Sequence, residues 1–476
     1  MSLRSLLLSL LAVSTLAVAE PPPCASPLHY RPALGSVADT VPFFWKGQYH
    51  VIYLRAGFKQ VPWEHIVSTD LVHWSELPSA LLPDGDPDGP AGQDIGTGSV
   101  IEHDGTFHIF CTGINPRNPR GEQCIMHATS SDLISWTWRP ADTFYADDVT
   151  YKNAGFRDAY VFWNDQARAF WMILCAVDAK TGRWTQGVAE SHDLVSWKQI
   201  QPLNYDPAPT VACECPDLFK IGDTWYMLQS VWYPKQATGT TDVRYSKDIR
   251  GPYRLSPTHA IDTPLLYAAK RMFDGKRHVL TGWIRDLGGA RDDGAPQFGG
   301  DQCIPREVYP GPAGQLYFRP VAEAVAQFNR SLLDSSTDSA LTALSTPIAT
   351  PADYLLQCDV RIHPGADFTL AMRQAGDASG YRIVIRSAKN EAEISSSKFS
   401  HPRHVAIDFT KPIKIQAFVQ GSIIECFIHD AYAFSCRAYG PRAGAVQMSV
   451  ANGQAQVIDL TVKSRETSSG PPLSSD

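Results

Sequence analysis

The heptapeptide Ser68-Thr-Asp-Leu-Val-His-Trp74 recurs in this chain as Ser130-Ser-Asp-Leu-Ile-Ser-Trp136 and as Ser191-His-Asp-Leu-Val-Ser-Trp197. A degenerate fourth copy runs from Ser246 to Tyr253. A second repeated element, a turn followed by an aromatic-rich strand, lies between these copies. It occurs five times, with its turns at Gly47, Gly105, Ala167, Gly222 and Gly275.

These repeats predict a five-bladed β-propeller. The five turns are 58, 62, 55 and 53 residues apart, and units of this length made of short strands and turns are typical of propeller blades. In each blade the Ser-x-Asp-Leu-x-x-Trp element would form the turn into the outer strand. Its Asp would cap backbone amides and its Trp would pack between blades, so we interpret both residues as structural.

The C-terminal segment has a different pattern. From Asp353 to Val462 polar and apolar residues alternate, as in Tyr381–Arg386, and turn residues such as Asn452-Gly453 interrupt the alternation. This pattern is typical of an antiparallel β-sandwich. We therefore predict an all-β chain with a propeller over 28–328, a linker over 329–350 and a sandwich over 351–463. The Ser- and Pro-rich tail, 464–476, is expected to be disordered.

The N-terminus indicates secretion. Arg4 precedes an apolar run from Leu6 to Val18, and Ala17-Val18-Ala19 is a small-residue cleavage site, which together are typical of a signal peptide over residues 1–19. The apolar run is too short to span a bilayer. We expect a secreted, extracellular protein without membrane contact, a monomer or a homodimer. In that compartment Asn329-Arg-Ser331 is an acceptor sequence for N-glycosylation, whether used or not.

The composition argues against a nucleic-acid partner. Lys and Arg number 42 and Asp and Glu number 49, so the 476-residue chain has a net charge of −7, and it contains no run of basic residues that would make a polyanion-binding patch. The 12 Trp and 18 Tyr residues fit a β-rich protein, and such residues are common where sugars are bound.

Secretion also permits disulfides among the 10 cysteines. The spacing of Cys111 and Cys124, and of Cys426 and Cys436, suits a bridge across a hairpin. Cys213-x-Cys215 lacks a second Cys or His pair at ligand spacing, so we expect no metal site there.

The register of the repeats selects residues that face the central channel. The innermost strand of each blade lines the channel and precedes the turn of the second element. Counting back eight or nine residues from each turn gives the set Asp39, Thr97, Asp158, Glu214 and Tyr267. Carboxylates that converge on one cavity repel one another and raise a pKa, as a general acid requires. The set therefore favours glycoside hydrolysis over the alternatives, a structural cation such as calcium or ion pairs with Arg157 and Arg306.

The same residues lie in motifs that resemble glycoside hydrolase family 32, the β-fructofuranosidases. The resemblance covers most of the chain after the signal peptide. Its motifs are Val37–Phe44, Trp63–Trp74, Gly96–Ser99, Arg157-Asp158, Glu214-Cys-Pro-Asp-Leu-Phe219, Tyr267-Ala268, Gly282-Trp283, Pro305-Arg-Glu307 and Ile424–Asp430. The family fold, a five-bladed propeller followed by a β-sandwich, agrees with the repeat count.

The resemblance implies a retaining double displacement that releases terminal β-D-fructofuranosyl units from sucrose, short fructo-oligosaccharides or fructans. Asp39 would be the nucleophile, Glu214 the acid/base, and Asp158 would hold sugar hydroxyls and stabilise the transition state. The carbohydrate is the only partner implied, with no metal and no organic cofactor. Arg157, also a substrate-binding candidate, would orient carboxylates. The other candidates for the sugar pocket, each equally compatible with a place in the core, are Trp63, Thr97, Ser99, Tyr267 and Trp283.

One motif departs from the family. The usual Trp-Met-Asn-Asp-Pro-Asn-Gly is replaced by Ser36–Pro42, which keeps Asp39 but lacks the Trp and both Asn residues. Two alternatives therefore stay open. One is an inverting arabinofuranosidase-like enzyme, whose carboxyls would lie about 6.5–9.5 Å apart instead of about 5–5.5 Å. The other is a catalytically weak, carbohydrate-binding propeller.

Overall fold

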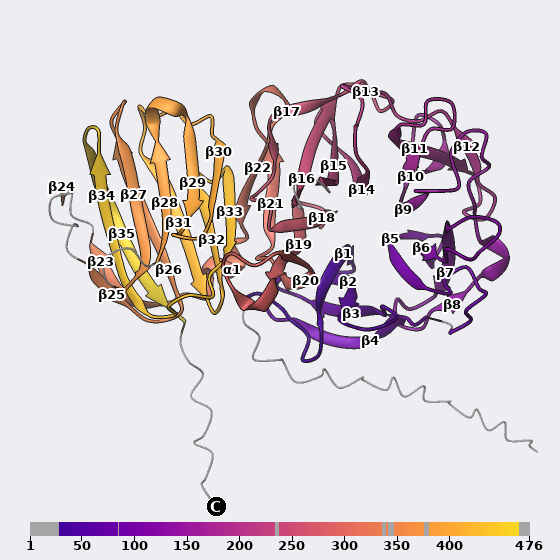
Figure 1. The fold of residues 1–476 in the computed structure, drawn as a ribbon, viewed down its shortest axis with the longest axis horizontal. Helices are drawn as coiled ribbons and strands as arrows, with labels where there is room; N and C mark the ends of the chain where they lie inside the picture. The colour runs from indigo at the N-terminus through magenta and orange to yellow at the C-terminus, as the bar shows by residue number, and fades with distance from the viewer. Residues whose placement is uncertain are drawn as a thin grey trace, which may run out of the picture.

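Two all-β bodies lie side by side in the protein (Figure 1). The structure, a computed structural model, describes residues 28–83, 85–233, 238–335, 339–340, 347–375 and 380–465. The predicted signal peptide, 1–19, and most of the predicted tail, 464–476, lie outside these residues. Within them a ring of blades precedes a two-layered sandwich, so the predicted fold class is confirmed.

Each of the first three blades is an antiparallel meander whose first strand lies innermost. Blade one contains β1 (Ser36–Trp45), β2 (Gln48–Ala56), β3 (Trp63–Ser68) and β4 (Ser75–Leu81). Blade two contains β5 (Asp94–His103), β6 (Thr106–Ile114), β7 (Gln123–Ser130) and β8 (Thr137–Trp138). Blade three contains β9 (Arg157–Asn164), β10 (Ala169–Val177), β11 (Trp184–Ser191) and β12 (Lys198–Ile200).

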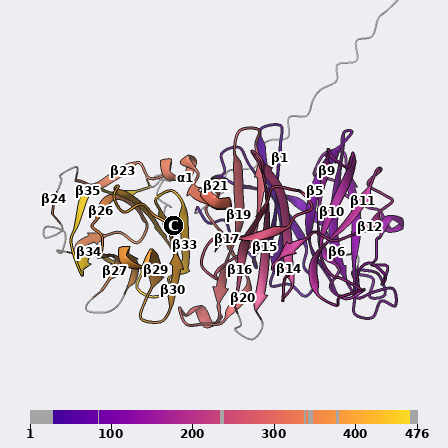
Figure 2. The same ribbon diagram turned by 90° about the horizontal axis from the view of Figure 1, so that it is seen from above.

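The last two blades carry additional strands. Blade four contains β14 (Cys213–Ile221), β15 (Thr224–Tyr233), β16 (Thr238–Ser246) and β17 (Tyr253–Ala260), with β13 (Tyr205–Asp206) parallel to β17. Blade five contains β18 (Leu266–Phe273), β19 (His278–Leu287), β21 (Arg306–Pro310) and β22 (Leu316–Pro320). The strand β20 (Pro296–Gln302) pairs with β19 and, where Val37 opposes Gly300, with β1. It thereby joins blade five to blade one and closes the ring (Figure 1), which lies beside the sandwich in Figure 2 as well.

The repeated heptapeptide forms the predicted turn between the third and fourth strands. The Asp70 carboxylate accepts hydrogen bonds from the amides of Val72 at 3.0 Å and His73 at 2.8 Å, and the equivalent acids of the next two blades accept the same pair of bonds. Trp74 is buried in the core. The structural interpretation of these residues is therefore confirmed.

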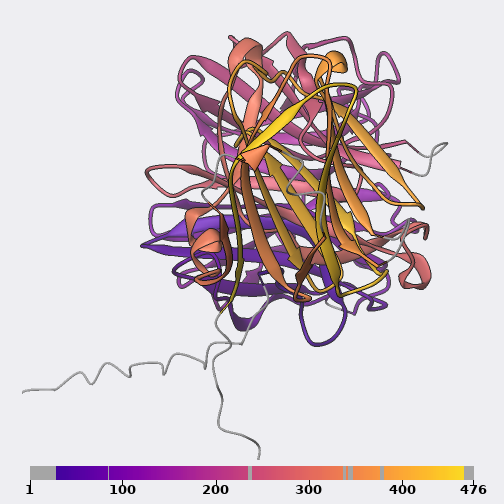
Figure 3. The same cartoon turned by 90° about the vertical axis from the view of Figure 1, so that its left-hand side faces the viewer.

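The sandwich packs two antiparallel sheets face to face, and Figure 3 views it in front of the propeller. The short helix α1 (Ala322–Ala326) precedes it, and no helix of the described residues is long and apolar enough to cross a membrane. One sheet contains β23 (Arg330–Ser335), β24 (Ser339–Ala340), β26 (Tyr354–Ile362), β31 (Ile413–Gln420), β32 (Ile423–Ile428), β33 (Tyr432–Arg437) and β35 (Ala455–Ser464). The other contains β25 (Ile348–Thr350), β27 (Asp367–Gln374), β28 (Tyr381–Arg386), β29 (Glu391–Ser395), β30 (Ser400–His404) and β34 (Gly444–Ala451).

The segment predicted as a linker, 329–350, begins and ends in the sandwich instead. Its strand β23 pairs with β35, Arg330 opposite Ser464, and β25 pairs with β34. Both strands lie at or near a sheet edge, where a strand needs backbone hydrogen bonds but little alternation of polar and apolar residues. A Ser- and Thr-rich sequence can therefore form a strand there without showing the usual pattern. Asn329, the predicted glycosylation acceptor, is exposed just before β23.

The two predicted hairpin disulfides do not form. All nine cysteines among the described residues are free and buried. Cys111 lies opposite Met126 while Cys124 lies opposite Gly113, and the second pair is offset in the same way. Diagonal neighbours in a sheet are about 7–8 Å apart, which exceeds the separation of α-carbons that a disulfide usually bridges.

A buried charge network joins the propeller to the sandwich. The guanidinium of Arg306, on β21, contacts the carboxylate of Asp262 at 2.7 Å and donates to that of Glu425 on β32, and none of these three side chains is exposed. His29 approaches Glu425 at 2.9 Å and Ser435 donates to Asp262 at 2.7 Å. Because buried charges are costly without partners, this network is stable only while the two domains stay together.

Replacing one acid of this network tests that dependence. The cation of Arg306 lowers the pKa of Glu425 to about 2, against the desolvation that burial imposes. The pair therefore stabilises the fold fully above the pKa of an unfolded Glu, and this contribution is lost as pH falls through about 2. Glu425→Gln should lower the free energy of unfolding by about 3–5 kcal/mol at pH 7, and by less as the pH falls below about 4.

Denaturant unfolding at pH 7 and pH 3 provides the measurement. Glu391→Gln is the matched control, because Glu391 pairs with Arg386 at the surface, where an ion pair contributes about 0–1 kcal/mol. Equal losses of stability in the two variants would contradict the assignment.

Candidate active site

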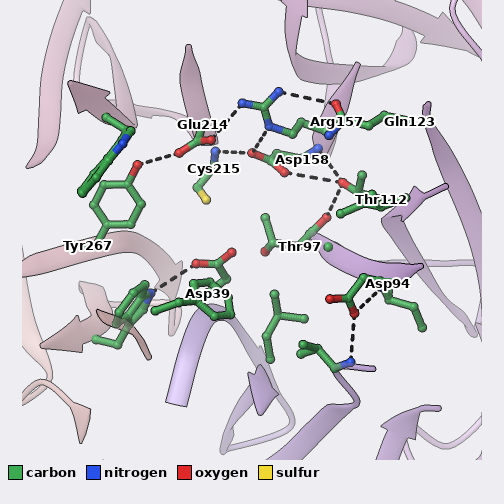
Figure 4. Close-up of a pocket in the computed structure, with 18 of the residues that line it drawn as sticks. Asp39, Asp94, Thr97, Thr112, Gln123, Arg157, Asp158, Glu214, Cys215 and Tyr267 are labelled. Atoms are coloured by element: carbon green, nitrogen blue, oxygen red, sulfur yellow. Dashed lines mark hydrogen bonds and ion pairs between the residues drawn. The ribbon is translucent and has the colours of Figure 1, made fainter. Parts of the chain in front are cut away.

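A cavity of about 440 Å³ opens at one end of the propeller channel. Its walls come from the inner strands of all five blades and from β19 and β20. Figure 4 shows Asp39 on one side of it, with Asp158 and Glu214 across from it. Of the residues predicted for the site, those that line the cavity are Asp39, Thr97, Arg157, Asp158, Glu214, Tyr267 and Trp283.

Every inner strand carries a β-bulge at the level of this cavity. In β1, Ala38 opposes Leu54 and Val41 opposes Ile52, so two residues of β1 face one residue of β2. The same two-against-one interruption occurs in β5, β9, β14 and β18. The first bulged residues are Asp39, Gly96, Asp158, Cys215 and Ala268, and all except Gly96 have a positive φ. A bulge redirects the side chains around it, and here it turns them toward the channel end.

The bulges correct the predicted register. Asp39 and Asp158 are the first bulged residues of their strands, but Glu214 and Tyr267 each precede the bulge by one position. The residue equivalent to Glu214 in blade three is Arg157, not Asp158. The three acids therefore meet in one cavity without sharing one position of the repeat.

Two donors hold the Glu214 carboxylate. The Arg157 guanidinium donates to its Oε1 at 2.9 Å, and the Tyr267 hydroxyl donates to its Oε2 at 2.6 Å. Both donors come from the position that precedes the bulge in a neighbouring blade. Glu214 is thus fixed at both oxygens at the edge of the cavity (Figure 4).

Asp158 is held by backbone and hydroxyl groups. Its Oδ2 accepts a hydrogen bond from the amide of Cys215 at 3.0 Å and lies 3.8 Å from Nε of Arg157. Its own amide donates to the Thr112 hydroxyl at 2.9 Å. These contacts tie the bulges of blades three and four together beside Glu214.

Asp39 has one direct donor and one cation beneath it. The Trp283 indole donates to its Oδ1 at 3.2 Å. Lys270, on β18 and buried, donates to the carbonyl of Gly98 at 2.6 Å, and its positive charge acts on both Asp39 and Asp158. The carboxylate therefore faces the cavity with its second oxygen available.

Burial raises the pKa of Asp39 and that of Asp158. Desolvation and the negative charge of Asp158 raise the pKa of Asp39 to about 7, while Lys270 opposes that rise. Burial also raises the pKa of Asp158, and the Arg157 cation opposes it. The mutual repulsion expected of converging carboxylates thus contributes to the raised pKa of Asp39.

Two predicted site residues lie away from the cavity. Trp63 is fully buried, and its indole donates to the carbonyl of Gly96 at 3.2 Å, so it supports the bulge of β5 from behind. The Ser99 hydroxyl accepts a hydrogen bond from the amide of Val161 at 3.0 Å and lies in a smaller cavity farther down the channel.

The structure adds residues that the sequence reasoning missed. Arg285 and Trp232 line the cavity on the side of blades four and five, and Asp94 lines it near blade two. Thr112 also lines it, and Lys270 acts from behind its wall. Lys270 stands three residues after Tyr267 and Arg285 two after Trp283, so proximity to the quoted motifs was the available indication.

No group of three or more His, Cys, Asp or Glu side chains arranged to hold a metal ion occurs in the part of the chain that the structure describes. The carboxylates supply the acid–base chemistry of the cavity. Two of them flank an open space, one held by two donors and the other carrying an available oxygen. This arrangement suits attack by one carboxylate and proton transfer by the other.

Comparison with known proteins places these residues in a family. Residues 29–320 match the family model described as the glycosyl hydrolases family 32 N-terminal domain. A maize (Zea mays) cell wall isozyme of beta-fructofuranosidase is 27% identical over 332 residues, which cover 62% of this chain and 55% of that protein. The chain spans about half the length of the curated relatives it matches.

Solved structures share the whole fold. Fructan 1-exohydrolase IIa from Cichorium intybus superposes with a TM-score of 0.74 at 18% identity, covering 92% of this chain and 96% of that one. Exo-inulinase from Aspergillus awamori gives a TM-score of 0.73 at 17% identity, covering 92% and 98%. These structures support the propeller-plus-sandwich architecture over nearly the full length of the described chain.

The raised pKa of Asp39 makes a prediction about stability. Since its folded pKa of about 7 exceeds the unfolded value of about 4, the ionised group destabilises the fold increasingly as pH rises between these values. Asp39→Asn should therefore raise the free energy of unfolding by about 4 kcal/mol at pH 8, and the two proteins should be equally stable near pH 4. Denaturant unfolding at both pH values measures this difference.

Asp70→Asn is the opposite-sign control. Hydrogen bonds lower the pKa of Asp70 against the desolvation that burial imposes, so its ionised form stabilises the fold and its replacement should lower stability at pH 8. A loss of stability on Asp39→Asn at pH 8 would refute the claim that the ionised carboxylate of Asp39 destabilises the fold.

Proposed function

Since the chain belongs to glycosyl hydrolase family 32, we propose that its propeller cavity hydrolyses terminal β-D-fructofuranosyl bonds with retention of configuration. The observation that carries the proposal is the placement of Asp39, Asp158 and Glu214 around one cavity, with separate donors for each carboxylate. A site that only binds sugar has no need to hold three acids together against their mutual repulsion.

The proposed first step uses Asp39 and Glu214 together. An oxygen of Asp39 attacks the anomeric carbon, the bond from that carbon to the leaving oxygen breaks, and Glu214 gives its proton to the leaving oxygen. In the second step Glu214 takes a proton from water, whose oxygen attacks the anomeric carbon and displaces Asp39. Asp158 accepts hydrogen bonds from ring hydroxyls and stabilises the positive charge of the transition state.

The acid/base role requires Glu214 to be protonated, and the nucleophile role requires Asp39 to be ionised, when catalysis begins. Trp283 and Lys270 favour the ionised form of Asp39, by a hydrogen bond and by charge. The Tyr267 hydroxyl can donate to an ionised Glu214 or accept from a protonated one, so its contact serves both states of the acid/base. Because these contacts favour an ionised Asp39 and are compatible with a protonated Glu214, they support Asp39 as the nucleophile in spite of its raised pKa.

The substrate class is proposed from the relatives. The maize relative is a beta-fructofuranosidase of the cell wall, and the chicory exohydrolase has been solved in complex with 1-kestose. We infer that this protein acts outside the cell, consistent with the predicted signal peptide, on sucrose, short fructo-oligosaccharides or the ends of fructans.

Replacement of the two central carboxylates tests the roles directly. Glu214→Gln and Asp39→Asn should each lower kcat on sucrose, 1-kestose or inulin by at least about a thousandfold, because Asp39 supplies the nucleophile and Glu214 transfers the proton in both steps. Glu76→Gln, which alters a carboxylate that accepts from Tyr30 away from the cavity, is the control and should retain activity.

The anomer of the product tests the stereochemistry in the same assay. Proton NMR of the first product, before mutarotation, should show β-fructofuranose. Release of the α-anomer, or release of arabinose from arabinan with none of fructose, would overturn the proposal.

Lys270 should set the acidic limb of the pH profile. Its charge lowers the pKa of Asp39, which must be ionised to attack, so kcat/KM should fall as pH drops through the pKa of Asp39. Lys270→Met removes the cation and should shift this limb toward higher pH, by about one pH unit. Lys276→Met removes a lysine on the exposed turn before β19 and should leave the limb unchanged. If the acidic limb of the kcat/KM profile stayed at the wild-type pH in Lys270→Met, Lys270 would only fill the channel.

A further inference from the structure

Arg285 is a buried cation without a hydrogen-bonding partner in the cavity wall. It lies on β19, lines the cavity, and is only 5% exposed. Its Nε is buried without any hydrogen-bond partner, and its guanidinium forms no ion pair or hydrogen bond with the described residues. A buried guanidinium in this condition is costly, because it has given up the water that satisfied its donors.

Other buried arginines of the described residues have partners at their terminal nitrogens, although the Nε of Arg244 and that of Arg373 are unpartnered as well. Arg244 donates to the carbonyls of Pro207 and Tyr253, and Arg373 donates to those of Gly421 and Ala438. By contrast, the N–H donors of the Arg285 guanidinium remain available to a ligand that enters the cavity.

Aromatic rings hold this guanidinium in place. Its carbon lies 4.1 Å from the ring centroid of Tyr267, 4.6 Å from that of Trp232 and 5.4 Å from that of Trp283. Such contacts are attractive and leave the N–H groups at the edge of the plane unused. The donors are therefore oriented before a ligand arrives, which reduces the entropy lost on binding.

The backbone of Arg285 is fixed from the sandwich. Arg437, on β33, donates from Nε to the carbonyl of Arg285 at 2.8 Å and from Nη2 to that of Ile284 at 2.6 Å. Arg437 is itself buried and contacts Asp286 and Asp301. The segment that carries Arg285 is thus braced from the side opposite the rings.

The charge of the cavity decides which ligand suits these donors. Four carboxylates line it, from Asp39, Asp94, Asp158 and Glu214, against two guanidinium groups, those of Arg157 and Arg285. An anionic substituent would approach this excess of acids at an energetic cost. Neutral hydroxyl groups accept hydrogen bonds from a guanidinium without that repulsion.

We propose that Arg285 donates hydrogen bonds to hydroxyl oxygens of the neutral fructosyl unit bound between Asp39 and Glu214. The inference rests on the proposed function and adds a binding residue to it. Arg285 lines the same cavity as both of these carboxylates, so a ring bound between them lies within the cavity that its guanidinium borders. Arg285 then contributes to the affinity for the sugar, and through its charge to specificity for unmodified fructosyl units.

The experiment compares Arg285→Met and Arg285→Lys with wild-type protein. The inhibition constant of free fructose, and KM and kcat on 1-kestose, should be measured for each. Loss of hydrogen bonds from a charged donor should raise the inhibition constant and KM by about ten- to a hundredfold in Arg285→Met. Arg285→Lys keeps the charge without the planar fork and should recover only part of the affinity.

Arg244→Met is the matched control. Arg244 is also 5% exposed and lies over a tyrosine ring, that of Tyr205 at 4.7 Å, but outside the cavity. It should lose stability while keeping the wild-type inhibition constant. If Arg285→Met folds, as judged by near-ultraviolet circular dichroism, and keeps the wild-type constant for fructose, Arg285 has a packing role only and the inference is wrong.

Two further outcomes separate the inference from the function on which it rests. Wild-type protein that releases no fructose from sucrose, 1-kestose or inulin would refute the proposed function itself. Active protein that prefers a 6-phosphorylated sucrose to sucrose, and loses that preference in Arg285→Met, would refute the neutral ligand while leaving the hydrolysis in place.

Discussion

One extra residue in each inner strand determines which side chains meet at the end of the propeller channel. Side chains of a regular strand alternate between two faces, so residues three apart point in opposite directions. A bulge between them restores a common face. Tyr267 and Lys270 are three apart across the bulge of β18, and Glu214 and Asp217 are three apart across that of β14. In both strands one side chain lines the cavity and the other lies buried beneath it.

The bulges thereby build two charged layers. The upper layer contains the acids of the cavity, and the lower layer contains Lys270 and Asp217, with Arg271 3.5 Å from the latter. The positive charge of Lys270 counters the acids above it, and Arg271 neutralises the negative charge of Asp217. The backbone cost is visible in the positive φ of 51° at Cys215 and 47° at Ala268, a region that residues other than Gly, Asn and Asp seldom occupy. Asp39 and Asp158 adopt a positive φ more easily than Cys215 and Ala268, because Asp tolerates this region of the backbone. At these two bulged positions the site also needs a carboxylate.

The sequence predicted the blades because each repeat carries its own turn chemistry, such as Asp70 capping its own amides. It could not predict the register within the cavity, because the turn residue used as the marker does not keep one place in the hairpins. The hairpins of blades one and four both have two-residue loops, but Gly47 is the second loop residue in one and Gly222 the first in the other. Counting back from the turns therefore found acids that line the cavity but misaligned Glu214 by one residue. Trp63 was misplaced for a related reason, because a motif shows that a residue is near the site and not which way it faces.

The strand β19 explains why a sandwich without a visible site of its own accompanies the propeller. This strand supplies Trp283 to Asp39 and Arg285 to the cavity, yet it lies second in its blade and must be held from outside the ring. Arg437 of the sandwich binds its carbonyls, and the carboxylates of Asp286 and Asp301 neutralise Arg437 in turn. Separation of the domains would expose these buried charges and release the strand at the same time. The geometry of the carboxylates thus depends on the sandwich although none of its residues lines the cavity.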